Sequence, residues 1–417
     1  MVDSYRSFMP HYVYIVSDTP LTLWGLSSRE RLRRLFTRLG SFIFLDALDA
    51  LPPDASVLLL RGDFLYDERI LKRLIHEEQT LLQVPVKSQH ISVAASVPAS
   101  LAPQASRLLS YPSDSPRLPN VHTVQLHEWS AGFQEQLRKF DPPYVLPITA
   151  DNQRALEEHL YSGSYKGVTD LITKWAWPIP AKWVVRVCVN LGIVPNVVTT
   201  VSVVLTVIAG VCFAQGAFGS GLVAGWIMTF LDTVDGKLAR VTVTSSKIGH
   251  ILDHGLDTIH PPLWYIAWGM GLAAFTPPTP WLSLFNIFMI IVSAYIAGRL
   301  CESVFKFRLG QFGLFCWRPV DSLNRLITAR RNPNLILLTG SLCMGRPDLG
   351  FLAVAAWTVL STAFLYLRLA LAFRAKAISG QPLRPWLADI GTYVHSESFV
   401  ARIFTRPPFT SIMTSPE

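Results

Sequence analysis

Four aspartates lie close together in the apolar half of this chain, and their spacing predicts a shared site. Asp232 and Asp235 stand at i and i+3, and Asp253 and Asp257 stand at i and i+4. On helices, the members of each pair share one face. Ionisable groups are costly inside a membrane, so carboxylates in such a region are functional candidates. The short stretch 241–248 between two such helices predicts that all four carboxylates meet.

Converging carboxylates repel one another unless a cation lies between them. An all-oxygen ligand set is typical of hard divalent cations such as Mg²⁺ or Mn²⁺. Two such ions clamp a phosphate and activate an oxygen nucleophile. Gly236 and Gly249 are positions where a ligand or another helix approaches the backbone, and Arg240 is a cation suited to phosphate. The run therefore predicts metal-assisted phosphoryl transfer.

Two other interpretations of the aspartates are a solvated helix face and the ion site of a cation transporter. Apolar neighbours such as Phe230, Ile251 and Leu252 argue against a solvated face. A cation transporter needs polar residues along its other spans, and the remaining apolar stretches do not offer them. His250 and His254 have the spacing of metal ligands. Because the aspartates already explain the region, these histidines are expected to cap or line the site.

The run D-x-x-D-G-x-x-A-R-x8-G-x-x-x-D-x-x-x-D resembles the defining motif of the CDP-alcohol phosphotransferase family. All eight specified positions match: Asp232, Asp235, Gly236, Ala239, Arg240, Gly249, Asp253 and Asp257. Upstream, Pro195-Asn196-x-x-Thr199 resembles the P-N-x-x-T that opens the first membrane helix in that family. The resemblance covers residues 166–375. A membrane prenyltransferase also uses aspartates and Mg²⁺, but its two aspartate motifs are far apart, and the glycines and Arg240 would then be unexplained.

The resemblance implies an integral membrane transferase of phospholipid or related phosphodiester synthesis. A CDP-linked alcohol such as CDP-diacylglycerol would donate its phosphoryl-alcohol group to an alcohol or alcohol phosphate, with release of CMP. Two Mg²⁺ or Mn²⁺ ions would be held by Asp232, Asp235, Asp253 and Asp257, with Asp257 also the general base. A homodimer is implied, and no nucleic acid partner is expected. The implied CDP site comprises Asn196, Thr199, Asp232, Gly236, Ala239, Arg240 and Gly249.

The acceptor alcohol is not specified by the motif. Arg325, Arg330 and Arg331, with Asn332 and Asn334, are placed to dock a second anionic group beside the metals. A basic flank on the cytoplasmic side of a membrane helix explains any one of these arginines equally well.

Half of the residues are apolar and the formal net charge is +8, which is typical of a membrane protein with basic cytoplasmic loops. The five cysteines form no C-x-x-C pair and are interpreted as small apolar residues. Six spans are predicted, the fifth being short and extending back through the Arg330 region. Basic residues gather in 306–331 and in the tail, so both termini and the aspartates are expected to be cytoplasmic, at the inner membrane if the protein is bacterial. The spans begin near Val197, Gly219, Ile248, Leu282, Asn334 and Leu349.

Residues 1–165 lack a signal-peptide pattern and predict a cytoplasmic α/β domain with a mostly parallel, doubly wound sheet. Residues 97–119 are rich in Pro and Ser and predict a loop or lid. Residues 166–194 predict an interfacial amphipathic helix, 195–375 a six-helix all-α membrane domain, and 376–417 a cytoplasmic tail. Strands are expected at 11–17, 41–45, 56–60, 91–95, 121–126 and 144–148, with helices at 28–39 and 67–78.

The N-terminal half resembles the sugar-nucleotidyltransferase fold. Val57–Asp63 resembles its strand that ends in a metal-binding aspartate, although Asp63 is equally explained as a turn residue. Trp24-Gly25-Leu26 stands at the place of the nucleotide loop, but Ser17–Thr22 replaces the glycine-rich phosphate loop. The fusion resembles bifunctional inositol-phosphate cytidylyltransferase and di-inositol-phosphate-phosphate synthase proteins. We expect a degenerate domain; the alternative is a bifunctional enzyme that also makes its CDP-alcohol, such as CDP-inositol, from CTP.

Overall fold

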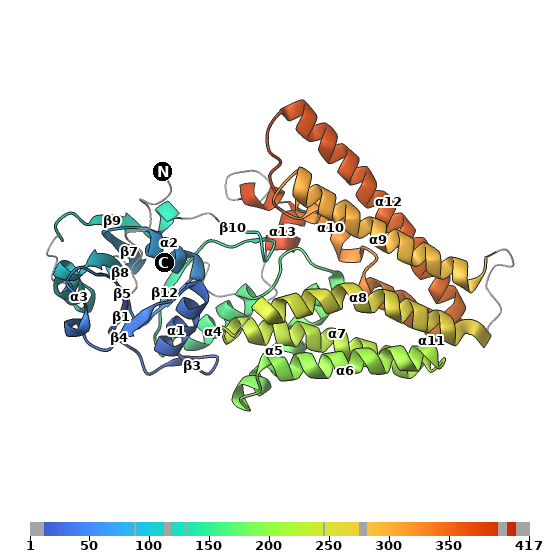
Figure 1. Cartoon of the computed structure of the whole chain (residues 1–417), viewed down its shortest axis with the longest axis horizontal. Helices are drawn as coiled ribbons and strands as arrows, with labels where there is room; N and C mark the ends of the chain where they lie inside the picture. The colour runs from blue at the N-terminus through green and yellow to red at the C-terminus, as the bar shows by residue number, and fades with distance from the viewer. Residues whose placement is uncertain are drawn as a thin grey trace.

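In a computed structural model, an N-terminal α/β region lies at one end of a C-terminal bundle of long helices (Figure 1). The structure describes residues 12–86, 89–111, 118–129, 132–244, 247–274, 282–390 and 398–405, and within 247–258 it describes the backbone alone.

The main sheet of the N-terminal region has six strands in the order β4-β1-β5-β8-β7-β9. The pairs β4–β1 and β1–β5 at one side and β7–β9 at the other are parallel, and β8 is antiparallel to both β5 and β7. Because only two residues separate β7 from β8, these strands must pair antiparallel. The sheet is therefore mixed: most of its strand pairings are parallel, as predicted, but β8 runs antiparallel to both of its neighbours. The strands are β1 (Tyr12–Val16), β4 (Ile43–Leu45), β5 (Ser56–Arg61), β7 (Thr80–Val86), β8 (Gln89–Pro98) and β9 (His122–Gln125).

Helices cover both faces of this sheet, as expected. Along β5, Leu58 and Leu60 point to the core formed with α1 (Ser28–Leu39) and α2 (Glu68–His76). Val57 and Leu59 point to the opposite core, formed with α3 (Ala102–Ser110). This alternation is the two-residue period of a strand that is buried on both faces.

The helix α3 corrects the expected loop or lid at 97–119, because Ala102, Ala105 and Leu109 share one buried face. Both predicted helices are confirmed: α1 spans the expected residues, and α2 begins just after its N-cap Asp67. The last predicted strand forms as β12 (Val145–Pro147), but it pairs with β6 (Phe64–Tyr66) outside the main sheet. A separate hairpin joins β10 (Phe133–Gln134) to β11 (Lys139–Phe140).

After α4 (Gln153–Gly163) and a π-helical turn at Ile172–Ala176, the chain is helical to residue 379 apart from short connections. The longer helices lie side by side in the bundle (Figure 1). Their bounds are α5 (Pro178–Asn190), α6 (Pro195–Ala214), α7 (Phe218–Val241), α8 (Lys247–Gly271), α9 (Leu284–Arg308), α10 (Pro319–Ile327), α11 (Arg331–Cys343) and α12 (Pro347–Ser379); a short α13 (Phe399–Thr405) follows.

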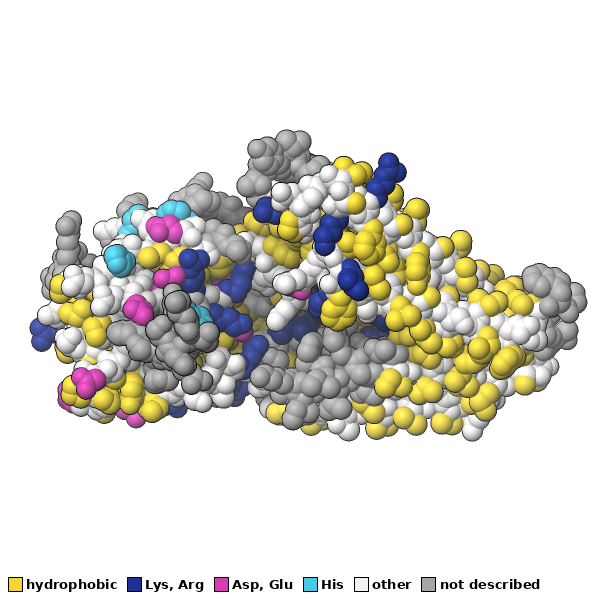
Figure 2. Space-filling view, turned by 45° about the horizontal axis from the view of Figure 1, so that its top comes forward, with side chains coloured by type: hydrophobic (Ala, Val, Ile, Leu, Met, Phe, Trp, Pro, Cys, Tyr) yellow, Lys and Arg dark blue, Asp and Glu magenta, His cyan; other side chains and the backbone are white. Residues whose placement is uncertain are grey.

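Three of the described helices, α6, α9 and α12, are long and apolar enough to cross a membrane, so the chain is an integral membrane protein. Hydrophobic side chains cover the helical half in Figure 2, while Lys and Arg gather where it meets the N-terminal half. Helix α11 rises only about 20 Å against a hydrocarbon core of about 30 Å. It begins at Arg331 after a break from α10, so the expected extension through Arg330 was wrong.

Helix α5 and the turn before it present an apolar stripe of the kind that lies at a membrane interface. The neighbouring Trp177 does not belong to this exposed stripe, because its ring packs against Trp226 and Phe230 of α7. The opposite face of α5 is buried through Ala181 and Val185. The exposed stripe repeats every four residues: Trp175, Ile179, Trp183, Val187 and Leu191. The five cysteines are all free, and Cys188, Cys301 and Cys316 are buried.

The segment expected at a nucleotide loop instead docks the two regions together. Trp24 and Gly25, both with positive φ, form the turn between β2 (Thr22–Leu23) and β3 (Leu26–Ser27). Trp24 is 1% exposed, and its backbone and indole N–H groups both donate to Glu157 on α4. The Arg186 guanidinium of α5 lies 4.1 Å from the Trp24 ring centroid.

Candidate active site

The motif aspartates on α7 face two neighbouring helices. Thr199 of α6 donates a 2.8 Å hydrogen bond from Oγ1 to Oδ2 of Asp235, which is 8% exposed. One turn earlier, Asp232 forms an ion pair with Arg331, the first residue of α11. The P-N-x-x-T segment and the aspartate run, which are far apart in sequence, are thus in direct contact.

Helix packing explains why α6 can hold Asp235 in this way. Pro195 stands in the first turn of α6, where its missing N–H costs nothing. Farther along, a Cβ at Gly221 of α7 would lie 2.5 Å from the Phe213 ring of α6. The absence of that side chain lets the two backbones approach closely.

Arg240 lies across Gly236 on the next turn of α7. A Cβ at Gly236 would stand 2.9 Å from Nη2 of Arg240, so among the described residues the nearest neighbour is this guanidinium and not a facing helix. The Arg240 charge also acts on Asp235. Of the other residues in the implied CDP site, Ala239 is half-buried and Asn196 is exposed at the start of α6.

The second half of the motif lies on α8, as the sequence predicts. Gly249, Asp253 and Asp257 follow one another at intervals of four along its backbone, and α8 packs against α6. The side chains of these residues, and those of His250 and His254, lie outside the described part of the chain. The convergence of all four carboxylates therefore stays a prediction.

The donor set fits a hard divalent cation as far as it is described. Asp232 and Asp235 present carboxylate oxygens one helical turn apart, and α8 carries two more carboxylates within its first three turns. Within the described residues, no three His, Cys, Asp or Glu side chains form a metal-binding group.

The three arginines expected at an acceptor phosphate have different partners. Arg331 pairs with Asp232, and Arg330 pairs with Glu302 of α9. Arg325 of α10 buries its Nε and Nη1 atoms without a hydrogen-bond partner among the described residues. The two asparagines of this segment also make specific bonds: Asn332 donates to Asp170 at 2.9 Å and Asn334 donates to Tyr265 at 2.6 Å.

Arg325 is a buried cation whose charge is only partly balanced. Burial, followed by the neighbouring Arg330 charge, lowers the pKa of Arg325 to about 9, so it remains cationic at neutral pH. Burial also opposes ionisation of Asp170, but the Arg325 charge and the hydrogen bonds from Asn332 and Thr173 outweigh it, and the pKa of Asp170 is lowered. An anion beside Arg325 would satisfy its unpaired nitrogens.

Arg138, from the turn between β10 and β11, is a residue that sequence reasoning missed. Its charge acts on both Arg325 and Arg330, and its Nε lies 3.9 Å from the position of a Cβ on Gly313. The backbone of Arg138 adopts a positive φ and accepts a hydrogen bond from Val168. No spacing in the sequence links residue 138 to the helices, so only the folded chain reveals it.

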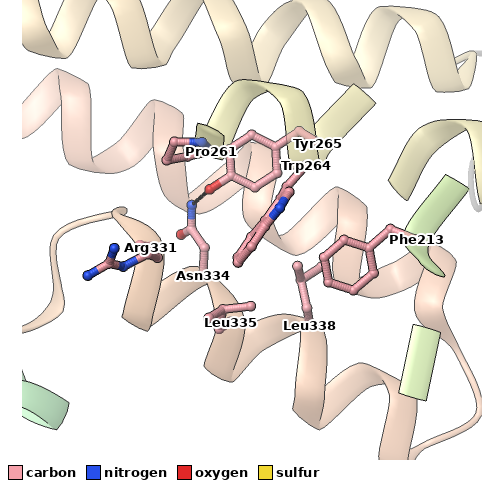
Figure 3. Close-up of a pocket in the computed structure, with 8 residues that line it drawn as sticks. All are labelled: Phe213, Pro261, Trp264, Tyr265, Arg331, Asn334, Leu335 and Leu338. Atoms are coloured by element: carbon pink, nitrogen blue, oxygen red, sulfur yellow. Dashed lines mark hydrogen bonds between the residues drawn. The ribbon is translucent and has the colours of Figure 1, made fainter. Parts of the chain in front are cut away.

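A small apolar pocket lies next to the Asp232–Arg331 pair, between α6, α8 and α11 (Figure 3). Arg331 stands at its edge with the guanidinium pointing away from it, while Asn334 and Tyr265 bond to each other at one side. The remaining lining is Phe213, Pro261, Trp264, Leu335 and Leu338. The site thus joins charged groups to an apolar surface.

Comparison with known proteins places the motif in a family. Residues 192–310 match the model of the CDP-alcohol phosphatidyltransferase family. This segment of the helical region is therefore similar to the CDP-alcohol phosphatidyltransferase family. The match includes α6, α7, α8 and α9, and with them Thr199 and all four aspartates.

Relatives share the same part of the chain. Cholinephosphotransferase 1 of Xenopus laevis is 34% identical over 124 residues, which are 27% of this chain and 30% of the relative. The human protein of that name is 28% identical over 169 residues, 37% of this chain and 41% of its own length. Archaetidylinositol phosphate synthase of Pyrococcus horikoshii is 33% identical over 81 residues, 19% of this chain and 43% of its own length. The chain thus spans less than half of each of these relatives.

The position of Arg240 over Gly236 leads to a first prediction. In Gly236→Leu the new side chain must displace the guanidinium from α7, and we expect at least a tenfold weaker affinity for a CDP-alcohol. Gly340→Leu is the matched control, because a Cβ there meets open space on α11. Affinity is measured by calorimetry with a nonreactive CDP-alcohol analogue. Equal affinity in the two variants would show that Gly236 does not keep the donor site open.

Proposed function

We propose that this protein is a membrane CDP-alcohol phosphotransferase, which transfers a phosphoryl-alcohol group from a CDP-linked alcohol to an acceptor alcohol and releases CMP. The contact between Thr199 and Asp235 is the observation that carries the proposal. It joins the two family motifs in one site, within the segment that matches the CDP-alcohol phosphatidyltransferase family.

In this proposal Asp232, Asp235, Asp253 and Asp257 hold two Mg²⁺ or Mn²⁺ ions, which when bound neutralise charge on the donor pyrophosphate. Thr199 orients the Asp235 carboxylate through its hydrogen bond. Asp257 accepts the proton of the acceptor hydroxyl at a carboxylate oxygen, so that the hydroxyl oxygen attacks the phosphorus bound to the leaving CMP. Asn196, Gly236, Ala239, Arg240 and Gly249 form the CDP site.

The surroundings favour a lipid-linked donor such as CDP-diacylglycerol. The site adjoins α6, a helix apolar enough to cross a membrane, so a donor whose chains lie in the lipid phase can reach it. The proposal includes six spans, cytoplasmic termini and a cytoplasmic active site, since the basic residues 306–331 adjoin the same end of the bundle. It also includes a homodimer, as the family implies.

The acceptor is proposed to carry an anionic group, most simply a phosphate. Arg325 offers two buried nitrogens without partners among the described residues, and Arg138 and Arg330 add positive charge nearby. One relative is named a cholinephosphotransferase and another an archaetidylinositol phosphate synthase. The unbalanced Arg325 charge favours a phosphate-bearing acceptor, as in the second name.

The N-terminal region is proposed to be a nucleotidyltransferase-like scaffold that has lost its own activity. Asp63, the expected metal ligand, is held by Arg61 through two hydrogen bonds of 2.6 and 2.9 Å. The Ser17–Thr22 segment packs against Gly62, where a Cβ would lie 3.0 Å from the Asp18 backbone. In the same place the amides of Thr19, Leu21 and Gly62 already donate to other groups of the chain, so they are not open to a triphosphate.

The direct test is CMP release from CDP-diacylglycerol by the purified full-length protein, with inositol phosphate and other alcohols as acceptors. We expect release that requires Mg²⁺ or Mn²⁺ and both substrates. Asp232→Asn should lower the rate at least a hundredfold, because the amide keeps the shape of the side chain but loses the charge that binds a hard cation. Asp389→Asn, in the C-terminal tail, is the control. Full activity of a folded Asp232→Asn protein would contradict the assignment.

The acceptor assignment makes a separate prediction. Arg325→Gln should raise the KM for a phosphorylated acceptor at least tenfold and leave the KM for the CDP donor within twofold. Of the two substrates, only the acceptor is proposed to contact this cation. Arg308→Gln, at the end of α9, removes an equal charge elsewhere. A rise in the donor KM alone, or no difference from the control, would remove Arg325 from the acceptor site.

The scaffold proposal predicts no nucleotidyl transfer. In the Asp232→Asn background, which silences the membrane site, CTP and a phosphorylated alcohol should yield no pyrophosphate above that of a protein-free control. Pyrophosphate release coupled to formation of a CDP-alcohol would refute the proposal and establish the bifunctional alternative, in which the protein makes its own donor.

A further inference from the structure

The motif helix α7 ends against the N-terminal region, not in solvent. The last carbonyls of a helix have no partner within it and attract cations. Arg31 of α1 donates from Nη2 to the carbonyl of Val241 at 2.8 Å, and from the same nitrogen to the carbonyl of Leu23 at 2.9 Å. Arg34, one turn later, donates from Nη1 to the carbonyl of Thr242 at 2.8 Å.

Arg31 is suited to this role because it is both buried and charged. It is 5% exposed, and burial lowers its pKa to about 10, so the guanidinium remains protonated at neutral pH. A single nitrogen therefore links the end of β2 to the end of α7. Arg33, between the two capping arginines, is exposed and does not share this position.

The residue after the α7 cap is anchored in the other region. Val243 has φ +53°, a left-handed conformation that is unfavourable for a β-branched side chain and is usually taken by glycine after a helix. The amide of Thr244 donates back to the carbonyl of Ala239 at 2.9 Å, which completes the helix end. The Val243 side chain is 6% exposed and belongs to the hydrophobic core that includes Leu32 and Phe36. Burial in this core compensates the backbone strain.

A second contact holds α7 between the end and the aspartates. Lys237 is 3% exposed and donates from Nζ to the carbonyl of Ser164 at 3.1 Å. The same nitrogen lies 3.4 Å from the ring centroid of Tyr165. Both partners belong to the segment that follows α4. Helix α7 is therefore contacted at Lys237 by this segment and at its C-terminal end by the α/β region.

We propose that the N-terminal region is a brace that sets the position of the C-terminal half of α7, and that Arg31 is a positioning residue for phosphoryl transfer. The inference rests on the proposed function for its effect on catalysis. Asp235 stands six residues before Val241, about 9 Å along the helix. A shift of the helix end is therefore transmitted to the aspartate within two turns.

The experiment compares Arg31→Met with Arg33→Met in the full-length protein. Hydrogen exchange is followed in peptides covering 236–244, and CMP release from CDP-diacylglycerol is measured against Mg²⁺ concentration. We expect Arg31→Met to raise exchange in this segment at least tenfold, to lower kcat at least tenfold and to raise the Mg²⁺ concentration for half-maximal rate. Arg31→Lys should recover part of each effect, because an ammonium also donates to carbonyls, and Arg33→Met should match the wild type.

The results that would overturn the brace proposal are specific. Unchanged exchange and unchanged Mg²⁺ dependence in Arg31→Met would overturn it, as would the same fall in activity in Arg33→Met. Should Arg31→Met fail to fold, Arg34→Met is the second variant; it loses one bond to the end of α7 and the ion pair with Glu30 inside α1. It is expected to give the same pattern at smaller size, and exchange and kinetics equal to those of Arg33→Met would overturn the proposal. If the wild-type protein releases no CMP while exchange still rises in Arg31→Met, the proposed function fails and the brace stands.

Discussion

The placement of Asp232 and Asp235 on a helix packed within a largely apolar bundle is the constraint on which the rest of this structure depends. Carboxylates at such a position must be balanced by cations or hydrogen bonds, or they would take up protons. Among the described residues, two neighbouring helices supply partners: Thr199 from α6 bonds to Asp235, and Arg331 from α11 pairs with Asp232. The bundle is therefore organised around two charges, and the apolar surfaces of α6, α9 and α12 place those charges at a membrane.

The N-terminal region contributes positive charge to the helical region at two separate places. Arg31 and Arg34 meet the carbonyls at the end of α7, and Arg138 adds to the cationic group around Arg325. Trp24, which stands where a nucleotide loop was expected, is buried against α4 and α5. The α/β region is thus joined to the helical region by buried side chains and by charged contacts.

Local patterns predicted local structure well. The amphipathic patterns of residues 28–39 and 67–78 located α1 and α2, and the family motif located α6, α7 and α8. The mixed sheet was missed because β7 was not recognised, and without it β8 was assigned to a parallel arrangement. The helix α3 was missed because Pro and Ser dominated the composition of 97–119, although Ala105 and Leu109 share an apolar face.

Most contacts between residues that are far apart in the sequence could not be predicted from it. The pairs Thr199–Asp235 and Asp232–Arg331 follow from motifs already suspected to share a site, but Arg31, Arg138 and Val243 carry no local signal of their function. Their roles arise because two regions with separate hydrophobic cores meet at one helix end, a relation that no residue spacing encodes. The positive φ of Val243 strains the backbone, and burial of its side chain in the core of the N-terminal region explains why the strain is tolerated.

The aspartates of α7 and α8 are proposed to form a site for two divalent cations. The most direct measurement is electron paramagnetic resonance of the full-length protein titrated with Mn²⁺ in the presence of CDP. Two bound ions per chain with a spectrum of magnetically coupled Mn²⁺ are predicted, with loss of the coupled signal in Asp235→Asn. Absence of bound Mn²⁺ in the folded wild-type protein, or a coupled signal that survives Asp235→Asn, would contradict the account.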